Sequence, residues 1–435
     1  MRHFRLFVSV IIVFCITTIT YAQEPTNVSP DDIPESVPLV DEGEYHIINF
    51  LLLGSDTSVS TNSGRTDVLM IVSVNQTAGT VSILSLPRDL YVYIPGQRVY
   101  RINSAYGYGE LAEQGSGAQL LIDTIRYNLG IEIDYWARVN FEGFKEIINN
   151  LGGLTVAVDC AIQDWRLIDP ELDPNVEENW EMYTLPVGLH TMDGDLALWY
   201  VRSRRTSSDF DRGRRQQAVL RATWRRIREL NLFEQLTDVW GQVLETVQTN
   251  IPFDVMAGLL PLATSINTSQ IASYTFRPNI EVRSWMSPEG SSVQAPNYEA
   301  IAQLIRNMYT PPTESQLVQE GARVEIINAT GIAGMDRVAA DRLAWEGFVP
   351  VLGSPAAQYQ GQTALYDFTG QTKGSSLGEI QTALRIQDSA VIIEPDANRD
   401  VDFRVVIGGS YYSCTYAVQP PSTPEPVANP EGGEG

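Results

Sequence analysis

The chain has 435 residues, of which 43% are hydrophobic and 9% aromatic, enough to form more than one folded core. Its formal net charge at pH 7 is −23. This excess of negative charge argues against general binding to nucleic acid, whose phosphates attract basic proteins. Ten of the 30 Lys and Arg residues are arginines between Arg202 and Arg228, so the composition still allows a local site for a specific anion.

The first 22 residues have the features of an export signal. Arg2 and Arg5 precede an apolar run from Leu6 to Ile19, and Thr20-Tyr21-Ala22 is typical of a cleavage site. The run is short for a membrane span, which needs about 20 apolar residues. We expect residues 1–22 to be a cleaved signal peptide, with a short uncleaved membrane anchor as the alternative. In both cases the rest of the chain is expected outside the cytoplasm.

An α/β domain is predicted over residues 45–309, after an acidic flexible spacer over residues 23–44 that is rich in proline, aspartate and glutamate. Strands that are apolar on both faces belong inside a sheet covered by helices. Such strands are predicted at Ile47–Leu53, Val68–Val74 and Val81–Leu86, with a further strand near Tyr274–Arg277. Helical spacing of apolar residues predicts the covering helices, which are Ala118–Leu129, Phe141–Leu151, Gln216–Leu232, Asp254–Thr264 and Tyr298–Met308.

A second, smaller α/β unit is predicted over residues 323–412, after a proline-containing linker at residues 310–322. It opens with a strand, a helix and a strand, and two more strands complete it. These elements are Val324–Asn328, Met335–Glu346, Phe348–Leu352, Ser389–Ile393 and Phe403–Ile407. Residues 413–435 are rich in proline, glutamate and glycine and are predicted to be a disordered tail.

Cysteines are few. Cys15 lies in the N-terminal apolar run, which leaves Cys160 and Cys414. A disulfide between these two is possible, but it would bridge the two predicted domains, so we expect both to be free thiols. The cysteine spacing matches no zinc motif.

Two carboxylates lie at the ends of predicted strands. Asp56 follows the first strand and Asp67 directly precedes the second, and strand ends are where α/β sheets place binding groups. Two carboxylates at one rim can hold Mg²⁺, whose other positions go to water and substrate phosphate. Arg65 beside them would contact a phosphate. Aspartate, serine and glycine also favour turns, so turn formation is the alternative explanation.

Arginines follow in two further segments. Arg88, in Pro87-Arg88-Asp89 after the third strand, either points to the same rim or forms a surface ion pair. If Tyr200–Arg204 is a strand, Arg202 and Arg204 point to one face, where a pyrophosphate would neutralise them. We expect Asp209 and Asp211 to orient these arginines.

The predicted helix around Gln216 has two kinds of basic position. Arg212 and Gln216 are four residues apart and share one face if the helix has begun there. Arg221, Arg225 and Arg228 lie opposite its apolar positions and are expected on a solvated face.

Taken in chain order, these motifs resemble those of the LytR-CpsA-Psr family of cell-envelope proteins. The similarity covers roughly residues 47–230 and rests on Leu51–Asp56, Gly64–Asp67, Leu86–Asp89, Arg101–Tyr106, Leu151–Leu154, Asp193-Gly194, Ala197-Leu198, Tyr200–Arg204, Asp209, Arg212 and Arg215-Gln216. Residues 323–411 resemble, more weakly, the small C-terminal domain often attached in this family.

The resemblance implies an α/β/α sandwich with a central mixed sheet. It also implies an Mg²⁺-dependent phosphotransferase that moves a glycopolymer from a polyprenyl-(pyro)phosphate carrier to peptidoglycan at the membrane surface of the cell envelope. Asp56 and Asp67 would hold the metal, while Asp209 would orient an arginine or assist the incoming hydroxyl. The phosphate-binding residues would be Arg65, Arg88, Arg202, Arg204, Arg212 and Gln216.

Two other functions stay open. In the first, the protein binds polyprenyl phosphate without catalysis. In the second, it is a regulatory protein of the transcriptional-attenuator type. The export signal and the net charge of −23 oppose direct DNA binding. The aspartate pair argues against a pure lipid binder, which has less need of a metal. A hydrolase that passes the phosphate to water is a milder variant of the enzyme.

Overall fold

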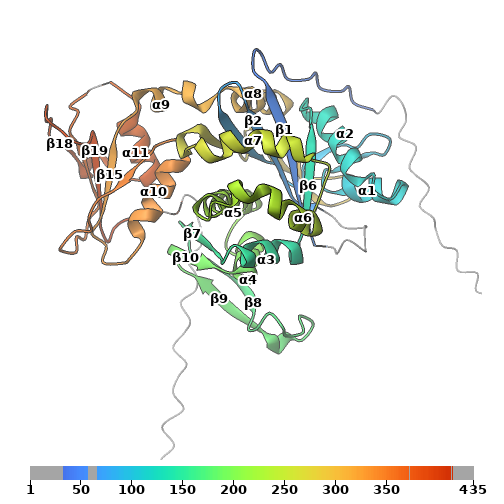
Figure 1. Cartoon of the computed structure of the whole chain (residues 1–435), viewed down its shortest axis with the longest axis horizontal. Coiled ribbons are helices and arrows are strands. Elements are labelled where there is room, and N and C mark those ends of the chain that lie inside the picture. The colour runs from blue at the N-terminus through green and yellow to red at the C-terminus, as the bar shows by residue number, and fades with distance from the viewer. Residues whose placement is uncertain (1–32, 57–65, 372, 413, 415–435) are drawn as a thin grey trace, which may run out of the picture.

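The computed structural model of the chain describes residues 33–56, 66–371, 373–412 and 414, which form a large and a small α/β unit (Figure 1). The predicted signal peptide, Arg65 and nearly all of the predicted tail lie outside these residues. In the part of the chain that is described, we find no helix with the length and apolar character that a membrane crossing requires.

The large unit is built around a six-stranded mixed sheet. Its strand order is β11-β6-β1-β2-β3-β12. The pairs β1–β2, β2–β3 and β6–β11 are antiparallel, and β1–β6 and β3–β12 are parallel. The strands are β1 (Ile47–Ser55), β2 (Thr66–Asn75), β3 (Thr80–Ser85), β6 (Tyr135–Asn140), β11 (Val247–Thr249) and β12 (Ile271–Thr275).

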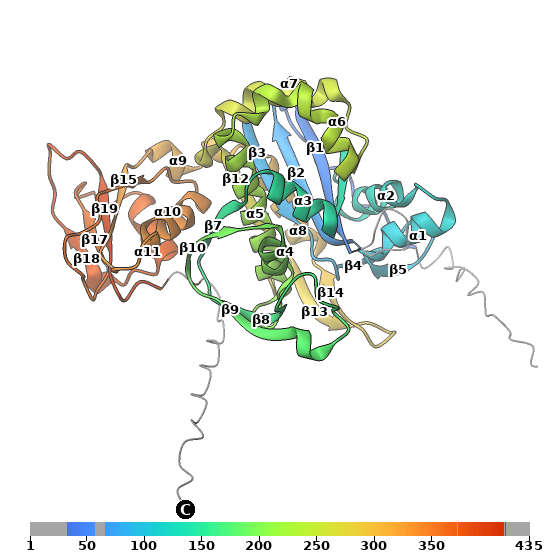
Figure 2. The same ribbon diagram turned by 60° about the horizontal axis from the view of Figure 1, so that its bottom comes forward.

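Helices cover both faces of this sheet, as the alternation of buried side chains requires (Figure 2). On one face, Leu51 and Ile71 belong to a core that also contains Leu121 of α2 and Ile305 of α8. On the other face, Met70 packs with residues of α5 and α7. The α/β/α sandwich with a central mixed sheet is therefore confirmed. The helices are α1 (Ser104–Ala112), α2 (Gly117–Leu129), α3 (Phe141–Asn150), α5 (Asp209–Glu229), α6 (Leu236–Thr246), α7 (Phe253–Ser265) and α8 (Tyr298–Tyr309).

Four two-stranded ribbons, which the sequence analysis did not predict, surround the sandwich. Two of them, β7–β10 and β8–β9, pack with α3, α4 (Gly194–Arg202) and α5 around a separate core that contains Leu154, Ile162, Tyr200 and Val219. The ribbon strands are β4 (Tyr91–Tyr93), β5 (Val99–Arg101), β7 (Leu154–Val158), β8 (Ile162–Leu167), β9 (Trp180–Leu185), β10 (Gly188–Met192), β13 (Val282–Met286) and β14 (Ser292–Pro296).

The strand that we considered at Tyr200–Arg204 does not form, because this segment is the end of helix α4 (Gly194–Arg202) and the loop that follows. Asp193 caps the helix by accepting the N–H of Leu196 at 2.8 Å. Ala197, Tyr200 and Val201 are buried at helical spacing, so the burial of one helical face decides the structure over local strand propensity.

Residues 33–44 of the predicted flexible spacer are described by the structure. They contain neither helix nor strand, yet they lie along α2. The N–H of Val37 donates to the carbonyl of Tyr127 at 2.8 Å, and the N–H of Val40 donates to that of Gly130 at 2.9 Å. Gly130 has φ = 67°, and a side chain there would collide with the carbonyl of Pro38, so glycine is required.

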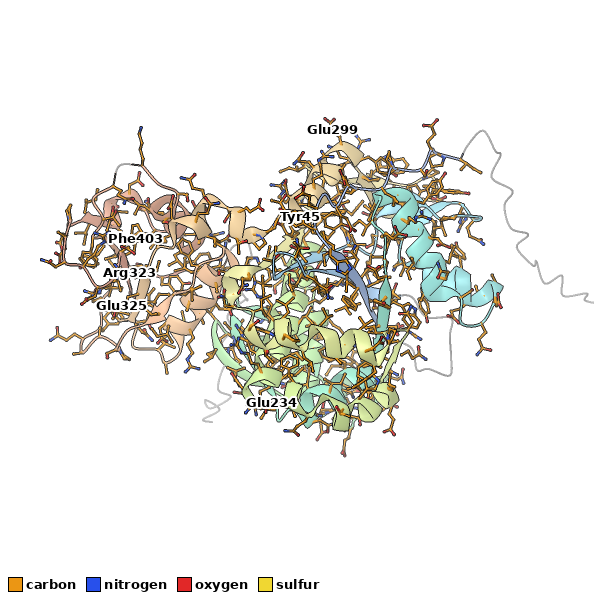
Figure 3. The ribbon with its side chains drawn as sticks, turned by 45° about the horizontal axis from the view of Figure 1, so that its top comes forward. Tyr45, Glu234, Glu299, Arg323, Glu325 and Phe403 are labelled. Carbon is orange, nitrogen blue, oxygen red and sulfur yellow. A yellow bond between two sulfur atoms is a disulfide. The ribbon has the colours of Figure 1, made fainter. Side chains whose placement is uncertain are left out.

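The small unit is a five-stranded mixed sheet of order β16-β15-β19-β17-β18 with helices α10 and α11. Its central strands β15 and β19 run parallel and pair Val324 with Phe403 and Glu325 with Arg404. Figure 3 shows Arg323, Glu325 and Phe403 together in this unit. The elements are β15 (Val324–Asn328), α10 (Met335–Trp345), β16 (Val351–Leu352), β17 (Ala364–Asp367), α11 (Ser376–Leu384), β18 (Val391–Ile393) and β19 (Phe403–Ile407). The segment predicted as a linker contains a short helix, α9 (Gln316–Glu320).

A disulfide between Cys160 and Cys414 joins the two units across 254 residues of chain, so the expectation of free thiols is wrong. We expected a domain boundary to keep the cysteines apart. Instead α10 packs against β7 and β10, and this contact brings the end of the small unit beside the loop after β7.

The expectation that Arg221 and Arg225 lie on a solvated face of α5 is also wrong, again because the two units are in contact. Arg225 forms an ion pair with Asp341 of α10 at 2.7 Å, and Arg221 is buried against Ala344 and the ring of Trp345. Burial lowers the pKa of Arg221 to about 10. Arg228 donates to the carbonyl of Ile266 at 2.9 Å. These arginines hold packed elements together.

Candidate active site

The two aspartates lie at one edge of the central sheet. Asp56 is exposed at the end of β1, and Asp67 is the second residue of β2. The register pairs Ser55 with Thr66, so the two carboxylates flank one cross-strand pair. Asp67 accepts a hydrogen bond from Nη1 of Arg88 at 2.7 Å.

Arg88 follows β3 and lies at the same edge. Besides its bond to Asp67, its Nε is 3.5 Å from a carboxylate oxygen of Asp89 and 3.7 Å from one of Asp209. Burial alone would lower the pKa of Arg88, but the hydrogen bond and charge of Asp67 raise it above its ordinary value. Nε is buried and makes no hydrogen bond within the described residues, so it has a donor to offer to an anion.

Asp209 gathers three arginines at the first turn of α5. One carboxylate oxygen is 3.3 Å from Nη1 of Arg212 and 3.6 Å from Nη1 of Arg204, and the other faces Arg88. Asp209 therefore lies where the sequence analysis expected a carboxylate that orients arginines. The same expectation for Asp211 is wrong, because Asp211 forms a capping box with Ser208 at the start of the helix.

Arg212 and Gln216 share one face of α5, as their spacing predicted. The Arg212 side chain is only 8% exposed. Burial, with the neighbouring charges of Arg88 and Arg204, lowers the pKa of Arg212 below its ordinary value. Gln216 donates from Nε2 to the carbonyl of Val201 at 3.4 Å. A narrow pocket at this point is lined by Asp67, Arg88, Asp209, Arg212 and Gln216, among others.

Arg202 and Arg204 line a neighbouring, open cleft of about 520 Å³. Arg202 ends α4, and its guanidinium lies 4.3 Å from the ring centre of Phe141. The Arg204 side chain is 50% exposed. Asp209 lines both the cleft and the narrow pocket, so the two are parts of one site.

The sequence analysis did not predict that two further residues hold the loop around Arg204. Arg215 is buried and donates to the carbonyls of Tyr200 and Ser203 and to the hydroxyl of Ser207. Asp164, on β8, accepts the backbone N–H groups of Arg204 at 2.9 Å and of Arg205 at 3.3 Å. The sequence signal for Arg215 was its place in a matched motif, and no local signal marks Asp164.

The aspartate edge presents oxygen atoms, the type of ligand that Mg²⁺ prefers in proteins. The described residues contain no group of three His, Cys, Asp or Glu side chains that could hold a metal. They do place two carboxylates beside Thr66, whose buried hydroxyl oxygen has no hydrogen-bond partner in the described part. Oxygen ligands of this kind, completed by water and phosphate, suit Mg²⁺.

The arginine side chains of this site suit an anion as ligand. Five arginines and three aspartates line the cleft and the narrow pocket, so guanidinium groups outnumber carboxylates here in a chain whose net charge is −23. Guanidinium groups match phosphate oxygens in bidentate geometry. The class that fold and site define is an α/β/α sandwich with an arginine-rich site at one edge of its sheet.

Residues 16–310 match the model of the LytR_cpsA_psr family, and residues 321–411 match that of the LytR cell envelope-related transcriptional attenuator. The chain belongs to the LytR-CpsA-Psr family.

Relatives of the chain have names that state an activity. "Polyisoprenyl-teichoic acid--peptidoglycan teichoic acid transferase TagT" of Bacillus subtilis (strain 168) is 31% identical over 237 residues, which are 52% of this chain and 68% of the relative. The corresponding TagU of Oceanobacillus iheyensis is 32% identical over 50% of this chain and 63% of the relative. "Regulatory protein MsrR" of Staphylococcus aureus (strain COL) is 32% identical, over 49% and 59%. The chain thus spans less than two thirds of the latter two.

Solved structures with similar sequences are also found. "TagT bound to LI-WTA" is 28% identical with a TM-score of 0.46, covering 63% of this chain and 94% of that one. "LytR-CPS2A-psr family protein YwtF (TagT) with bound octaprenyl pyrophosphate lipid" is 26% identical with a TM-score of 0.43, over the same shares.

Proposed function

We propose that the protein is an extracytoplasmic phosphotransferase of cell-wall assembly. It moves a glycopolymer from a polyprenyl-(pyro)phosphate carrier at the membrane surface to a sugar hydroxyl of peptidoglycan. The observation that carries the proposal is the convergence of Arg88, Arg204 and Arg212 on Asp209, beside the carboxylate of Asp67. The names of the TagT and TagU relatives support the substrate class.

Substrate binding follows from the charge of the site. A pyrophosphate in the open cleft would accept hydrogen bonds from Arg202 and Arg204, and Arg88 and Arg212 would add positive charge from the adjoining narrow pocket. Because Arg212 is buried beside two other arginines, an anion also relieves repulsion among them. Binding energy and charge neutralisation thus come from the same groups.

The transfer step needs little covalent chemistry from the protein. The acceptor hydroxyl oxygen forms a bond to the phosphorus that carries the glycopolymer, and the bond from that phosphorus to the bridging oxygen breaks. The arginines neutralise the charge that develops on the departing polyprenyl phosphate. Asp209, between cleft and pocket, takes the proton of the acceptor hydroxyl.

We further propose that the enzyme depends on Mg²⁺, held by Asp56 and Asp67. The metal would add positive charge next to the transferred phosphoryl group. The Thr66 hydroxyl between the two aspartates has no hydrogen-bond partner among the described residues, which supports this assignment.

The test is the transfer of a labelled lipid-linked glycan to peptidoglycan fragments in vitro. We expect Arg204→Ala to lower the rate by about 100-fold or more, because a donor to the transition state is lost. Arg202→Ala should act in the same direction. Arg306→Ala is the control, since Arg306 is exposed on α8 at the opposite face of the sheet. Full transfer activity in both site variants, with circular dichroism unchanged, would exclude the proposal.

A regulatory function is the second candidate, because the MsrR relative is named a regulatory protein. It predicts that the wild-type protein binds the lipid-linked glycan without turning it over. Product analysis in the same assay distinguishes these two functions. It also distinguishes transfer of the phosphoryl group to a sugar from its transfer to water.

A further inference from the structure

Arg204 stands on a loop without regular structure, residues 203–207, which we call the arginine loop. The hydrogen bonds that hold this loop come from two sides. From α5, Arg215 donates to Ser203 and Ser207. From β8, Asp164 accepts the N–H groups of Arg204 and Arg205, and the N–H of Gln163 donates to the hydroxyl of Thr206 at 3.2 Å.

The start of β8 is in turn held by the small unit. Cys160, two residues before β8, forms the disulfide with Cys414. Its neighbour Asp159 forms an ion pair with Arg214 at 3.1 Å. Cys160 and Ile162 also line a small cavity together with residues of the arginine loop, so this segment packs directly against the loop.

Helix α10 of the small unit completes this support. The ring of Trp345 lies 4.9 Å from the guanidinium carbon of Arg214 and 5.0 Å from that of Arg221. Asp341 pairs with Arg225 one turn further along α5. Both elements that hold the arginine loop, α5 and the start of β8, are therefore bound to the small unit.

We infer that the small C-terminal unit positions the arginine loop of the large unit, and that Asp164 is the positioning residue through which it acts on Arg204. The covalent connection runs from Cys414 to Cys160 and reaches Asp164 four residues later. The inference deepens the proposed function and rests on it for its consequence in catalysis. It gives the C-terminal unit a task inside the enzyme, where the sequence alone suggested a separate module.

The reason is entropic. A loop that holds a guanidinium group in one place has lost conformational entropy. Binding is tighter when the loop is ordered before the substrate arrives, because the entropy cost then does not reduce the free energy of binding. One carboxylate oxygen of Asp164 accepts two hydrogen bonds, from the peptide N–H groups on the two sides of the Arg204 Cα atom, and so fixes the backbone there. Without them the loop has to be ordered by the substrate. We expect affinity for a short prenyl pyrophosphate to fall about tenfold.

Asp164→Ala tests this in the full-length protein, with geranyl pyrophosphate as the probe. Hydrogen exchange at residues 203–207 should become faster without ligand, and calorimetry should show affinity reduced about tenfold. Asp164→Asn keeps an acceptor oxygen and should restore slow exchange and most of the affinity. Asp173→Ala is the matched control, because Asp173 also accepts a backbone N–H in the β8–β9 hairpin but lies away from the loop. Equal exchange in wild type and Asp164→Ala would overturn the inference.

The double variant Cys160→Ala/Cys414→Ala tests the role of the small unit. We expect faster exchange in residues 203–207 and affinity reduced about threefold or more, while far-ultraviolet circular dichroism stays the same. Unchanged loop exchange in the folded double variant would show that the small unit does not support the loop. Failure of wild type to bind geranyl pyrophosphate would contradict the proposed function, whereas the exchange data would still decide the positioning role.

Discussion

Asp209 lies where the narrow pocket and the open cleft of the site meet. Its carboxylate is one third exposed and faces three guanidinium groups. This position allows two tasks, the orientation of the arginines and the acceptance of a proton from an incoming hydroxyl. The two tasks affect different kinetic constants and can therefore be separated.

Asp209→Asn should lower kcat by about 100-fold or more and change the donor KM by less than about threefold. Asparagine keeps the shape and an acceptor oxygen for the arginines, but it cannot take a proton at neutral pH. Steady-state transfer kinetics with donor and acceptor varied separately give both constants. A large rise in donor KM with kcat preserved would assign Asp209 to arginine orientation alone.

Most candidate site residues in the described part could be named from the sequence, because their motifs place them at strand ends and at the start of a helix. Arg88, Arg204 and Arg212 indeed lie within one group of ion pairs. Asp164 could not be found in this way. Its hydrogen bonds join residues 40 and 41 positions apart and depend on a ribbon with no strong periodic signal. The different environments of Asp209 and Asp211 were also not predictable, since helix capping separates them.

At the scale of elements, α5 connects the site with the small unit. Its first two turns carry Asp209, Arg212 and Gln216 of the site. Further along, Arg221 and Arg225 contact α10. The ten arginines of this segment thus include residues that join packed elements as well as residues of the candidate site.

Trp345 is the aromatic partner of two of these arginines. We expect Trp345→Ala to lower the free energy of unfolding by about 2 kcal/mol, through lost packing and two lost cation–π contacts. Trp345→Phe keeps a ring at this position and should lose less than half as much. Chemical denaturation followed by circular dichroism measures both. Equal losses in the two variants would mean that the aromatic face contributes nothing beyond its volume.

The predicted strands agree with the structure where side chains are buried along most of the strand. Strands β1, β2 and β3 are apolar over most of their length, and a sheet covered on both faces leaves few other structures for such runs. The segment after Gly194 has aromatic and β-branched residues that also suit a strand, and only the capping by Asp193 and the burial of one face make it a helix. The short ribbons depend on contacts between distant segments and gave no such signal.

At the scale of the whole molecule, the two units are joined by packing, ion pairs and one disulfide. The sequence predicted that both units exist, since each has its own pattern of apolar strands and helices. It did not predict their contact, because the partners lie far apart along the chain. Residues 159 and 160 meet residues after 340 only once both units are folded. The cysteine pairing is therefore a consequence of tertiary structure.

The pH dependence of stability should include a contribution from the small unit. Asp402 precedes β19 and accepts hydrogen bonds from Arg323, which precedes β15, and from Arg399. Burial would raise the pKa of Asp402, but these hydrogen bonds lower it to about 2. A carboxyl whose pKa is lower in the folded than in the unfolded state stabilises the fold above its unfolded value, near 3.8, and this stabilisation is lost as the pH falls toward 2.

Asp402→Asn should therefore lower the free energy of unfolding by about 1 kcal/mol near neutral pH, a value reduced for screening by solvent, and by almost nothing near pH 2. Urea unfolding of wild type and variant at several pH values measures the difference. Because the same unit supports the arginine loop, we also expect exchange at residues 203–207 to quicken in the variant at neutral pH. A difference in stability that stays constant from neutral pH to about pH 2 would show that Asp402 acts through packing and not through its charge.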